Sequence, residues 1–518
     1  MKNKKKLIII SSIVAVLLIG IMLLLIFLPK GGEENQDLTD TIDQGTDMSL
    51  TTDESGVHQA QVQTNEKGEI DNNSYGTLVD YIPADIKTIH VENKAGTMDI
   101  KSETPVNENG ETQATIYTLV GYEDFELQTG VADAVANDAA KIEFLSVISL
   151  DGKKASECGL DDPRATVTVE YTDGTKSVVI VGSDAPQSAG TYVKFGTSET
   201  IYLVAAEAVD SFTYGVNDLF SVMVNDTPSD SNNLQYSKVS LSGTNFPKEI
   251  VFEPNSDFTK NAASCVLVSP DKWFASEVGT SNITGAVRGL VAEKVIMVNP
   301  SDNQLSELGL AKPYARLEVV YPDETITLLA SAPDSEGKVN FMVEGEKVVY
   351  KYAAEKLPWV TISYNDVVTE YVMHSNISAV SQLVVNNGSA TYNFALSTKE
   401  TASVDDDGNE DTTTTTVVKY GDKEINSGYF STYFQNITLL ERSDLSSASA
   451  SGDRVLTVEF KYADGSTDKV EFVSTGASTY LAVVNGKTLG NVHKTNVDKI
   501  CNQTKLIAEN KDVANLLA

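Results

Sequence analysis

Short segments of this chain alternate strictly between apolar and polar residues. One run, TVTVEYTDGTKSVVIVG at 166–182, is followed by TYVKFG and TIYLV, and later parts of the chain read FMVEGEKVVYKY and TYLAVVNGKTLGNV. Turn residues such as Asp-Gly or Asn-Gly interrupt the alternation. Period-two alternation with such turns is typical of antiparallel β-meanders, so the sequence predicts several of them.

A second pattern has the spacing of an amphipathic helix and occurs three times. The apolar positions are Val131, Val135, Ala139, Ile142 and Leu145 in the first stretch, Ile283, Ala286 or Val287, Leu290 and Val291 in the second, and Phe430, Phe434, Ile437 and Leu440 in the third. Each set forms one stripe at about 3.6 residues per turn. Short helical segments are also expected at 205–212, 353–360 and 495–500.

The same motif recurs along the chain. Gly159, Leu160, Pro163, Tyr171 and Asp173 match Gly309, Leu310, Pro313, Tyr321 and Asp323 at an offset of 150 positions. A weaker third copy keeps Tyr462, Asp464 and Gly465 but lacks Gly-Leu-x-x-Pro. Self-similarity at a fixed period indicates tandem units. We therefore predict repeat units at 76–225, 226–372 and 373–518, the last one divergent.

Each unit reads as strands, a helix, further strands and a short helix. This order predicts an α+β fold, in which three tandem antiparallel sheets are each covered by one amphipathic helix. The Gly-Leu-x-x-Pro element is expected to be a joint: Gly leaves the helical region, Leu plugs the core, and Pro forces the preceding residue into an extended conformation.

Residues 1–29 have the character of an uncleaved signal anchor. The run Leu7–Leu28 carries no charge and follows Lys2, Lys4, Lys5 and Lys6. As a helix it would span about 33 Å, enough for the hydrocarbon core of a bilayer. The lysines favour a cytoplasmic N-terminus, which predicts an extracytoplasmic location for the bulk of the chain. A cleaved signal peptide is the alternative, but no small-residue cleavage site follows the run.

Residues 30–75 are rich in acidic and small polar residues and contain few large apolar side chains. Such a segment buries too little apolar surface to offset chain entropy. We predict a disordered acidic stalk between the anchor and the first repeat unit.

The charge balance excludes some classes of partner. With 39 Lys+Arg against 73 Asp+Glu, the 518-residue chain has a formal charge of −34, which opposes binding to nucleic acid and to anionic lipid surfaces. The three cysteines, Cys158, Cys265 and Cys501, lack metal-ligand spacing. We interpret them as small buried residues in an exported protein that is not built on disulfides.

No catalytic or cofactor-binding motif is recognisable, so no catalytic, cofactor or metal residue is predicted. His58, His90, His374 and His493 are far apart and are expected on the surface or on edge strands. The acidic run from Asp405 to Asp411 lacks the spacing of a calcium loop, and a solvated hairpin tip explains it, although calcium binding stays an alternative.

The two tryptophans leave a similar choice open. Trp273 precedes the second helical stretch and Trp359 lies near the end of the second unit. We interpret both as core residues, and a carbohydrate-stacking platform is the alternative.

The helix, Gly-Leu-x-x-Pro and the Asp-Gly-type turn together resemble a bacterial family catalogued as domain of unknown function 4340. The resemblance covers Phe125–Val224 and extends more weakly over Trp273–Trp359 and Tyr429–Ile500. It implies a membrane-anchored, extracytoplasmic protein that is often encoded beside a gliding-type ABC transporter, whose subunits are candidate partners. It implies no active site.

These observations lead to three functional hypotheses. The first is a non-enzymatic, membrane-tethered extracytoplasmic scaffold or binding protein associated with an ABC-type envelope transport system. The second is a module that binds cell wall or surface polymer. The third is an envelope hydrolase, which would need His, Glu or Asp residues from separate units to converge in one cleft.

Overall fold

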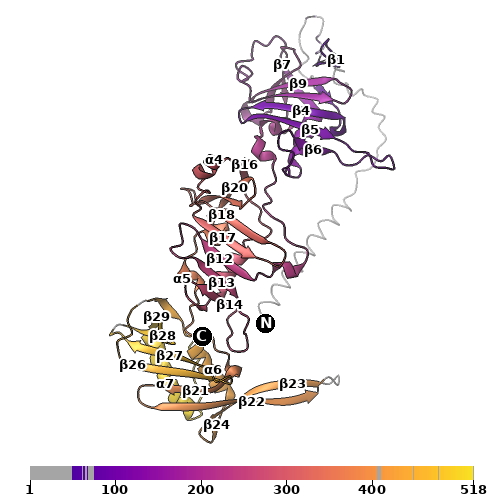
Figure 1. Ribbon diagram of the computed structural model, residues 1–518. Coiled ribbons are helices and arrows are strands. Elements are labelled where there is room, and N and C mark those ends of the chain that lie inside the picture. Colours follow the sequence, from indigo (N-terminus) through magenta and orange to yellow (C-terminus); the bar gives the residue numbers. More distant parts are fainter. Residues whose placement is uncertain are drawn as a thin grey trace, which may run out of the picture. The chain divides into compact units, whose positions relative to one another are not determined.

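A computed structural model describes residues 50–60, 62, 64, 67, 75–404, 410–446, 448–476 and 478–516 (Figure 1). The predicted membrane anchor at 1–29 and most of the predicted stalk lie outside these residues. Among the helices of the described residues, none combines the length and the apolar character needed to cross a bilayer. Contacts divide the chain into two compact parts, which differ from the three repeat units. One part holds the described residues up to Lys87 and Asp138–Asp210, and the other holds the described residues of Thr88–Asn137 and from Ser211 onward.

The described chain is mostly β, with three nine-stranded sheets, each antiparallel, and a two-stranded hairpin. The first sheet consists of β3 (Gly76–Asp80), β4 (Ile86–Asn93), β5 (Gly96–Glu103), β6 (Ile116–Leu119), β7 (Lys141–Ser149), β8 (Ala165–Tyr171), β9 (Lys176–Asp184), β10 (Thr191–Phe195) and β11 (Ile201–Val204). The second consists of β12 (Lys238–Ser242), β13 (Ile250–Pro254), β14 (Cys265–Ser269), β15 (Trp273–Phe274), β16 (Lys294–Val298), β17 (Ala315–Val320), β18 (Thr325–Ala330), β19 (Lys338–Val343) and β20 (Val348–Ala353). The third consists of β21 (Val380–Asn386), β22 (Thr391–Val404), β23 (Glu410–Tyr420), β24 (Lys423–Ile425), β25 (Arg442–Leu445), β26 (Arg454–Tyr462), β27 (Thr467–Ser474), β28 (Thr479–Val484) and β29 (Lys487–His493).

The sheets share the strand order at and beside their meanders, which confirms the prediction of tandem units; the first sheet differs at its edges, with three strands and not four before the meander and an additional edge strand, β3. The orders are β6-β5-β4-β8-β9-β10-β11-β7-β3, then β15-β14-β13-β12-β17-β18-β19-β20-β16, and then β24-β23-β22-β21-β26-β27-β28-β29-β25. In each sheet a four-stranded meander starts after the repeated motif, and its last strand pairs with the strand that precedes the motif. The exact boundaries of the repeat units stay predictions.

Helices occupy far less of the described chain than strands do, so the α+β prediction is confirmed only in part and the fold is mostly β. The helices of the described residues are α2 (Val131–Ala140), α3 (Glu277–Thr284), α4 (Asp302–Glu307), α5 (Tyr364–Val367), α6 (Ser427–Thr438) and α7 (Lys494–Ala508), with several short 3-10 turns. Two expected helices were placed wrongly in part. Ile142 and Leu145 belong to strand β7, where period-two burial prevails. Of the second stripe only Ile283 lies in α3, which ends at Thr284; Ala286, Val287, Leu290 and Val291 all lie beyond it. Helix α6 agrees with its prediction up to Ile437.

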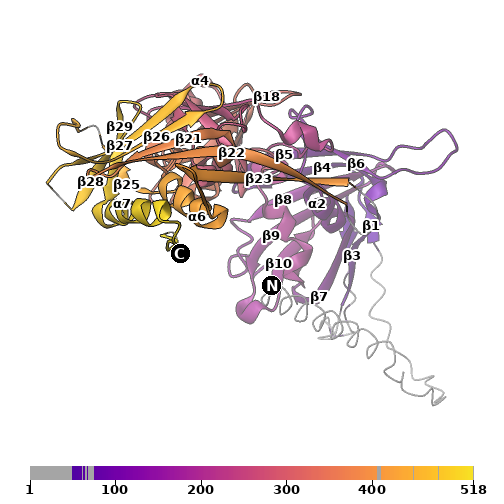
Figure 2. The same cartoon turned by 90° about the horizontal axis from the view of Figure 1, so that it is seen from below.

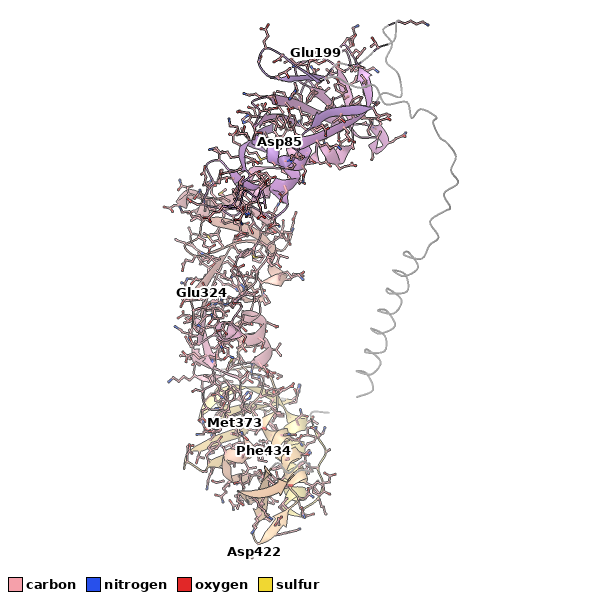
Figure 3. The ribbon with its side chains drawn as sticks, turned by 90° about the vertical axis from the view of Figure 1, so that its right-hand side faces the viewer. Asp85, Glu199, Glu324, Met373, Asp422 and Phe434 are labelled. Carbon is pink, nitrogen blue, oxygen red and sulfur yellow. The ribbon has the colours of Figure 1, made fainter. Side chains whose placement is uncertain are left out.

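In the third unit, α6 and α7 pack beneath one face of the sheet (Figure 2). Phe430, Phe434 and Ile437 of α6 belong to the same core cluster as the inward residues of β26 and β27. Figure 3 labels two members of this core, Met373 and Phe434. Because Tyr433 of α6 also bonds Thr504 of α7 through its buried hydroxyl, at 2.6 Å, the two helices are fixed to each other.

The Gly-Leu-x-x-Pro element is a structural joint, as predicted. Gly159 and Gly309 adopt φ values of 68° and 76°, the left-handed region that glycine enters without strain. Leu160 and Leu310, next in sequence, are buried in small apolar clusters against their own sheets. In the third sheet Val473, Leu481 and Val483 form such a cluster, and Ala450 of the loop that replaces the motif packs against it.

Part of the predicted stalk is folded, which corrects that prediction. Strands β1 (Leu50–Thr52) and β2 (His58–Ala60) pair as a hairpin, and Val57 bridges to Lys176 at the start of β9. The buried His58 lies 2.9 Å from the hydroxyl of Tyr81, whose ring stacks on Tyr171 at 3.7 Å. Polar contacts of this kind leave no apolar pattern in the sequence, so composition missed the hairpin.

We expect Gly309→Ala to lower the free energy of unfolding by about 2–3 kcal/mol, because it adds a steric contact to an unfavourable φ. The new Cβ would lie 3.2 Å from the Cβ of Ser331. Gly337→Ala is the matched control, since Gly337 has a φ of 74° and no atom within 4 Å of an added Cβ. It should cost only about 1 kcal/mol. Urea denaturation measures both changes, and equal losses would contradict the role of the Ser331 contact.

Candidate functional site: a groove beside the second inter-sheet linker

The linker from Val367 to Asn376 connects the second sheet to the third and pairs with both. It is bonded on one side to the segment just before α3, and on the other to the segment that enters β25. The backbone hydrogen bonds are Ser276 N to Val367 O (2.8 Å), Thr369 N to Phe274 O (3.1 Å), Val372 N to Leu440 O (2.9 Å) and Arg442 N to Glu370 O (2.7 Å). The linker is therefore a shared strand and not a free tether.

The linker from Leu219 to Asn225 is built in the same way. Its bonds are Gln128 N to Leu219 O (2.7 Å), Ser221 N to Glu126 O (2.9 Å), Val224 N to Leu290 O (2.8 Å) and Ala292 N to Val222 O (2.8 Å). These four bonds correspond one by one to those of the second linker, at offsets of 148 or 150 positions. The repeat thus includes the linkers as well as the sheets.

Arg442 fastens the second linker from the third sheet. This arginine is only 8% exposed. Its guanidinium donates to the backbone oxygens of Asn365, Val368 and Thr369 and to the side-chain oxygen of Asn365, at 2.7–3.3 Å. Hydrogen bonds from a charged donor are stronger than neutral ones. Burial lowers the pKa of Arg442, but the group stays cationic at neutral pH.

The repeated Tyr-x-Asp motif supplies a second fastening. In the third sheet Lys260, from a loop of the second unit, lies 4.4 Å above the Tyr462 ring and 3.9 Å from the carboxylate of Asp464. In the second unit Arg288 lies 4.2 Å above Tyr321 and 2.6 Å from Asp323. A cation is thus held between a ring face and a carboxylate in both copies.

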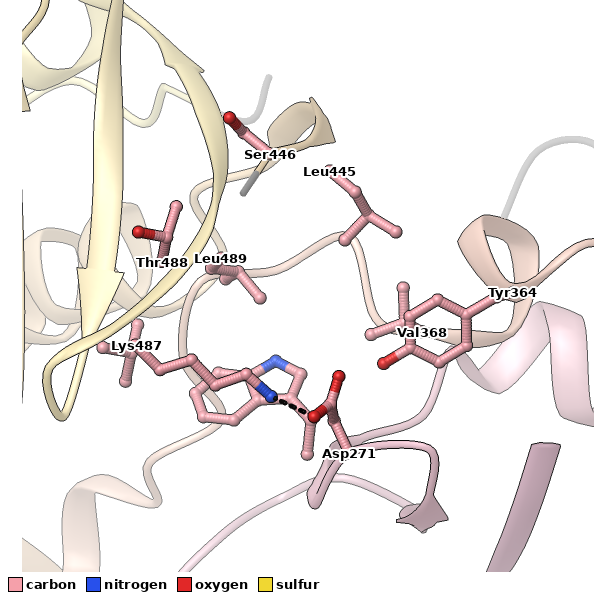
Figure 4. A pocket seen from close by; sticks show the side chains of 10 residues that line it. Asp271, Tyr364, Val368, Leu445, Ser446, Lys487, Thr488 and Leu489 are labelled. Carbon is pink, nitrogen blue, oxygen red and sulfur yellow. Dashed lines mark ion pairs between the residues drawn. The ribbon is translucent and has the colours of Figure 1, made fainter. Parts of the chain in front are cut away.

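A cavity of about 510 Å³ opens beside the second linker (Figure 4). Residues of the second unit form one wall, namely Asp271, Trp273, Tyr364 and Val368, and residues of the third unit form the other, namely Leu445, Ser446, Val484, Lys487, Thr488 and Leu489. Lys487 reaches across to Asp271 at 3.0 Å. Figure 4 shows the hydroxyl of Tyr364 turned toward the same carboxylate. Burial raises the pKa of Tyr364, so this hydroxyl remains protonated.

Two further cavities complete this picture. One of about 510 Å³ shares Asp271, Tyr364 and Leu445 with the first and extends it along Phe246, Pro247, Ile250 and Ile362. We call the two together the joint groove. The other, of about 560 Å³, lies beside the first linker. Its residues Glu123, Phe125 and Phe220 occupy the positions of Asp271, Trp273 and Val368.

The structure revises several residue predictions. His90 on β4 and the exposed His493 agree with a surface position, and His58 lies on the edge strand β2, although its side chain is buried. His374 lies in the second linker and is largely buried, which the prediction did not expect. Trp359 is fully buried, as predicted for a core residue, while Trp273 is half-buried and lines the joint groove. The three cysteines are free, with Cys158 and Cys265 buried and Cys501 half-buried.

The acidic run lies largely outside the described residues, because only Glu410 and Asp411 of that run are placed, at the start of β23. Among the described residues, no group of three or more His, Cys, Asp or Glu side chains is arranged to hold a metal ion. Sequence reasoning missed Arg442, Asp271 and Lys487, since single charged residues in an acidic chain carry no pattern. The repeated Tyr-x-Asp was a usable signal for the cation sites at Arg288 and Lys260.

Comparison with known proteins identifies residues 118–224 as a match to the family described as Domain of unknown function (DUF4340). This confirms the resemblance over the first copy of the motif. No curated protein and no solved structure matches the chain.

Replacing Arg442 by Met should lower the free energy of unfolding by about 2–4 kcal/mol, because three buried carbonyls and an amide lose their donor. Arg454→Met is the matched control, since Arg454 is half exposed and forms an ion pair with the carboxylate of Glu471, at 2.9 Å. That change should cost less than about 1 kcal/mol. Chemical denaturation gives both values. If the two variants lose the same stability, Arg442 does not fasten the linker.

His374 makes stability depend on pH. Its ring lies against Phe274 and Tyr371 and 2.7 Å from the hydroxyl of Thr369, and burial lowers its pKa to about 4. Between pH 6.5 and 4 the unfolded chain binds a proton at this site that the folded chain does not, so stability falls as pH decreases.

We expect this group to contribute at most about 3 kcal/mol to the loss of stability between pH 6.5 and 4. His374→Gln preserves a polar group near Thr369 and removes the titration. Urea denaturation across this range should show that the free energy of unfolding of the wild type falls, relative to that of the variant, as the pH decreases from 6.5 to 4. A constant difference would show that His374 does not titrate as described.

Proposed function

We propose that the protein is a non-enzymatic, membrane-tethered scaffold or binding protein of the bacterial cell envelope, associated with an ABC-type transport system. The observation that carries the proposal is the pair of matched linkers, each hydrogen-bonded on both sides and each with an open cavity beside it. Strands that are paired on both sides resist local opening. A paired strand with an open cavity beside it can present a binding surface, which suits a scaffold.

The location in the proposal comes from the sequence. The uncharged run Leu7–Leu28 behind four lysines would serve as the transmembrane signal anchor, with the repeat units on the extracytoplasmic side. One amphipathic helix would cover each sheet, of which α6 is the best-defined example. The net charge of −34 would keep the exported units soluble and away from the anionic membrane surface.

The chemistry of the joint groove favours binding over catalysis. Its walls are mainly apolar and aromatic, and its one carboxylate–lysine pair is engaged in an ion pair at 3.0 Å. Pockets that bind ligands combine apolar walls with a few polar groups in this manner. The transporter as partner rests on the family resemblance alone, within residues 118–224.

A second candidate function is direct binding of cell wall or surface polymer. Trp273 and Tyr364 both line the joint groove, and aromatic side chains of this kind offer an apolar face with a polar edge. Purified ectodomain should then sediment with isolated cell walls at both low and high salt. Failure to sediment under both conditions would reject this candidate.

The main proposal is tested in intact cells. A reporter that is active only outside the cytoplasm, fused after Ala518, should be active, and the same reporter on a chain lacking residues 1–29 should not. Affinity purification from detergent-solubilised membranes should recover ABC transporter subunits with the full chain. An inactive reporter would contradict the topology, and the absence of transporter subunits would remove the transporter from the proposal.

A further inference from the structure

The hairpin of β1 and β2 is attached to the first sheet mainly through polar groups. Lys176 N, at the start of β9, donates to the carbonyl of Gly56 at 2.9 Å. The side chain of Gln59 accepts a backbone N–H from the turn after β10, also at 2.9 Å. Among the described side chains of the hairpin, only His58 and Ala60 are buried. Because a two-stranded hairpin is at best marginally stable by itself, its attachment depends strongly on His58.

The hydrogen bonds of Tyr81 decide which nitrogen of His58 carries the proton. The Tyr81 hydroxyl lies 2.9 Å from Nε2 of His58. The same hydroxyl lies 3.2 Å from the carboxylate of Asp173 and 3.0 Å from the hydroxyl of Thr175. Because Thr175 donates its own proton to Asp173 at 2.6 Å, the Tyr81 proton goes to one of these two acceptors. The Tyr81 oxygen then accepts from His58, so Nε2 carries the proton of the neutral ring.

The other nitrogen of His58 has no place for a proton. Nδ1 is buried and has no hydrogen-bond partner among the described residues. Protonation of the ring puts an N–H and a positive charge at this atom, and a buried charged donor without an acceptor costs free energy. Burial accordingly lowers the pKa of His58, although the carboxylate of Asp173 opposes this shift. The docked hairpin therefore disfavours the protonated histidine.

The charged surroundings do not offset this cost. The charged and titratable side chains of the hairpin and of the segments beside His58 are Asp53, Glu54, Tyr81, Tyr171, Asp173, Lys176, Lys194 and Glu199. Lys194 and Glu199 pair with each other at 2.8 Å. Asp173 is linked to the histidine ring through the Tyr81 hydroxyl. No carboxylate of this set is thus bonded directly to the ring.

The first copy of the Tyr-x-Asp motif differs from the other two in the kind of group that it holds. In the second and third units a permanent cation, Arg288 or Lys260, lies over the tyrosine ring of the motif. In the first unit the ring of Tyr81 lies over Tyr171 instead, at 3.7 Å. The Tyr81 hydroxyl is bonded to His58, a residue that changes its charge near neutral pH. A titratable contact therefore stands where the other copies have a fixed charge.

We propose that the β1–β2 hairpin is attached to the first sheet in a pH-dependent manner, and that protonation of His58 at Nδ1 releases it. Release exposes the ring to water, which solvates the new N–H and its charge. The attachment is fully favourable above about pH 6.5, the ordinary pKa of histidine, and it weakens as the pH falls below that value.

Release changes the segment that leads to the predicted membrane anchor. The hairpin lies in the chain between residues 1–29 and β3, which is an edge strand of the first sheet. A released and extended segment Leu50–Ala60 spans up to about 36 Å. Acid would thus lengthen the predicted tether and expose the parts of Tyr81 and Tyr171 that the His58 ring contacts. This inference goes beyond the proposed scaffold function, because it holds for any partner.

Hydrogen–deuterium exchange of the full chain in detergent micelles tests the inference, with protection factors referred to the unstructured chain at each pH. Between about pH 7.5 and pH 5, the protection of the amides at 50–60 should fall by about 3-fold to 30-fold. The upper value is the limit for one group with an ordinary pKa of 6.5 that binds no proton in the docked state. The amides of β8 and β9 should keep their protection, because both strands are paired on either side.

His58→Gln is the matched variant, because its amide can donate to Tyr81 from the position of Nε2 but does not titrate. Its hairpin should keep the same protection at both pH values. His90→Gln is the control, since His90 also titrates but forms its ion pairs with Asp99 and Glu92. It should lose hairpin protection on acidification as the wild type does. Tyr81→Phe removes the acceptor of His58 and should lower hairpin protection at least about threefold even at pH 7.5.

A second measurement does not depend on how well the variants dock. NMR of ¹³C-labelled histidine gives the pKa of His58 in the wild type, since its signal is the one absent from His58→Gln. This pKa should lie below 6.5. A value of 6.5 or more would overturn the inference, and so would a fall in hairpin protection smaller than about threefold. An equal fall in His58→Gln, or a parallel loss in β8 and β9, would overturn it as well.

Discussion

Main-chain pairing along the two linkers is the constraint on which the rest of the structure depends. A linker that bonded to one side only would be a flexible tether, which few contacts cross. The first linker bonds to the segment before α2 and to the segment after α3, and the second bonds to the segment before α3 and to the segment after α6. The positions of Trp273 and Leu445 at the groove follow from the second linker, since each lies within a few residues of a bonded segment.

Side chains reinforce the second linker in a way that the first does not share. Arg442 corresponds to Ala292, which bonds to the first linker, so the four side-chain hydrogen bonds of Arg442 have no counterpart there. The ammonium group of Lys260 also lies over the ring of Tyr462, and the hydroxyl of Ser375 hydrogen-bonds to the hydroxyl of Tyr462 at 2.7 Å. The cavity beside the first linker keeps Glu123 and Phe125 but carries more acidic residues. The two cavities therefore share a framework and differ in chemistry.

The sheets were predictable because their signal is local. Period-two alternation and Asp-Gly turns located the meanders, and Gly159 and Gly309 revealed the repeat because a left-handed φ favours glycine strongly. The helices were less predictable. Ile142 and Leu145 fit the helical spacing, but both lie in strand β7, which pairs with β11, and there they face opposite sides, with Ile142 buried and Leu145 exposed. The hairpin at Leu50–Ala60 was not predicted, because His58 and Gln59 hold it through polar contacts.

The sequence by itself determined the tandem organisation, the strand-rich character and the absence of any recognisable catalytic motif, since each depends on residue types at short spacing. Only the tertiary structure decided which side chains hold the linkers and line the groove. Arg442, Lys260, Asp271 and Lys487 look like ordinary charged residues in a highly charged chain, and their partners lie far away in sequence. Long-range pairing of single residues leaves no periodic trace, so the groove became visible only when the second and third sheets were brought together.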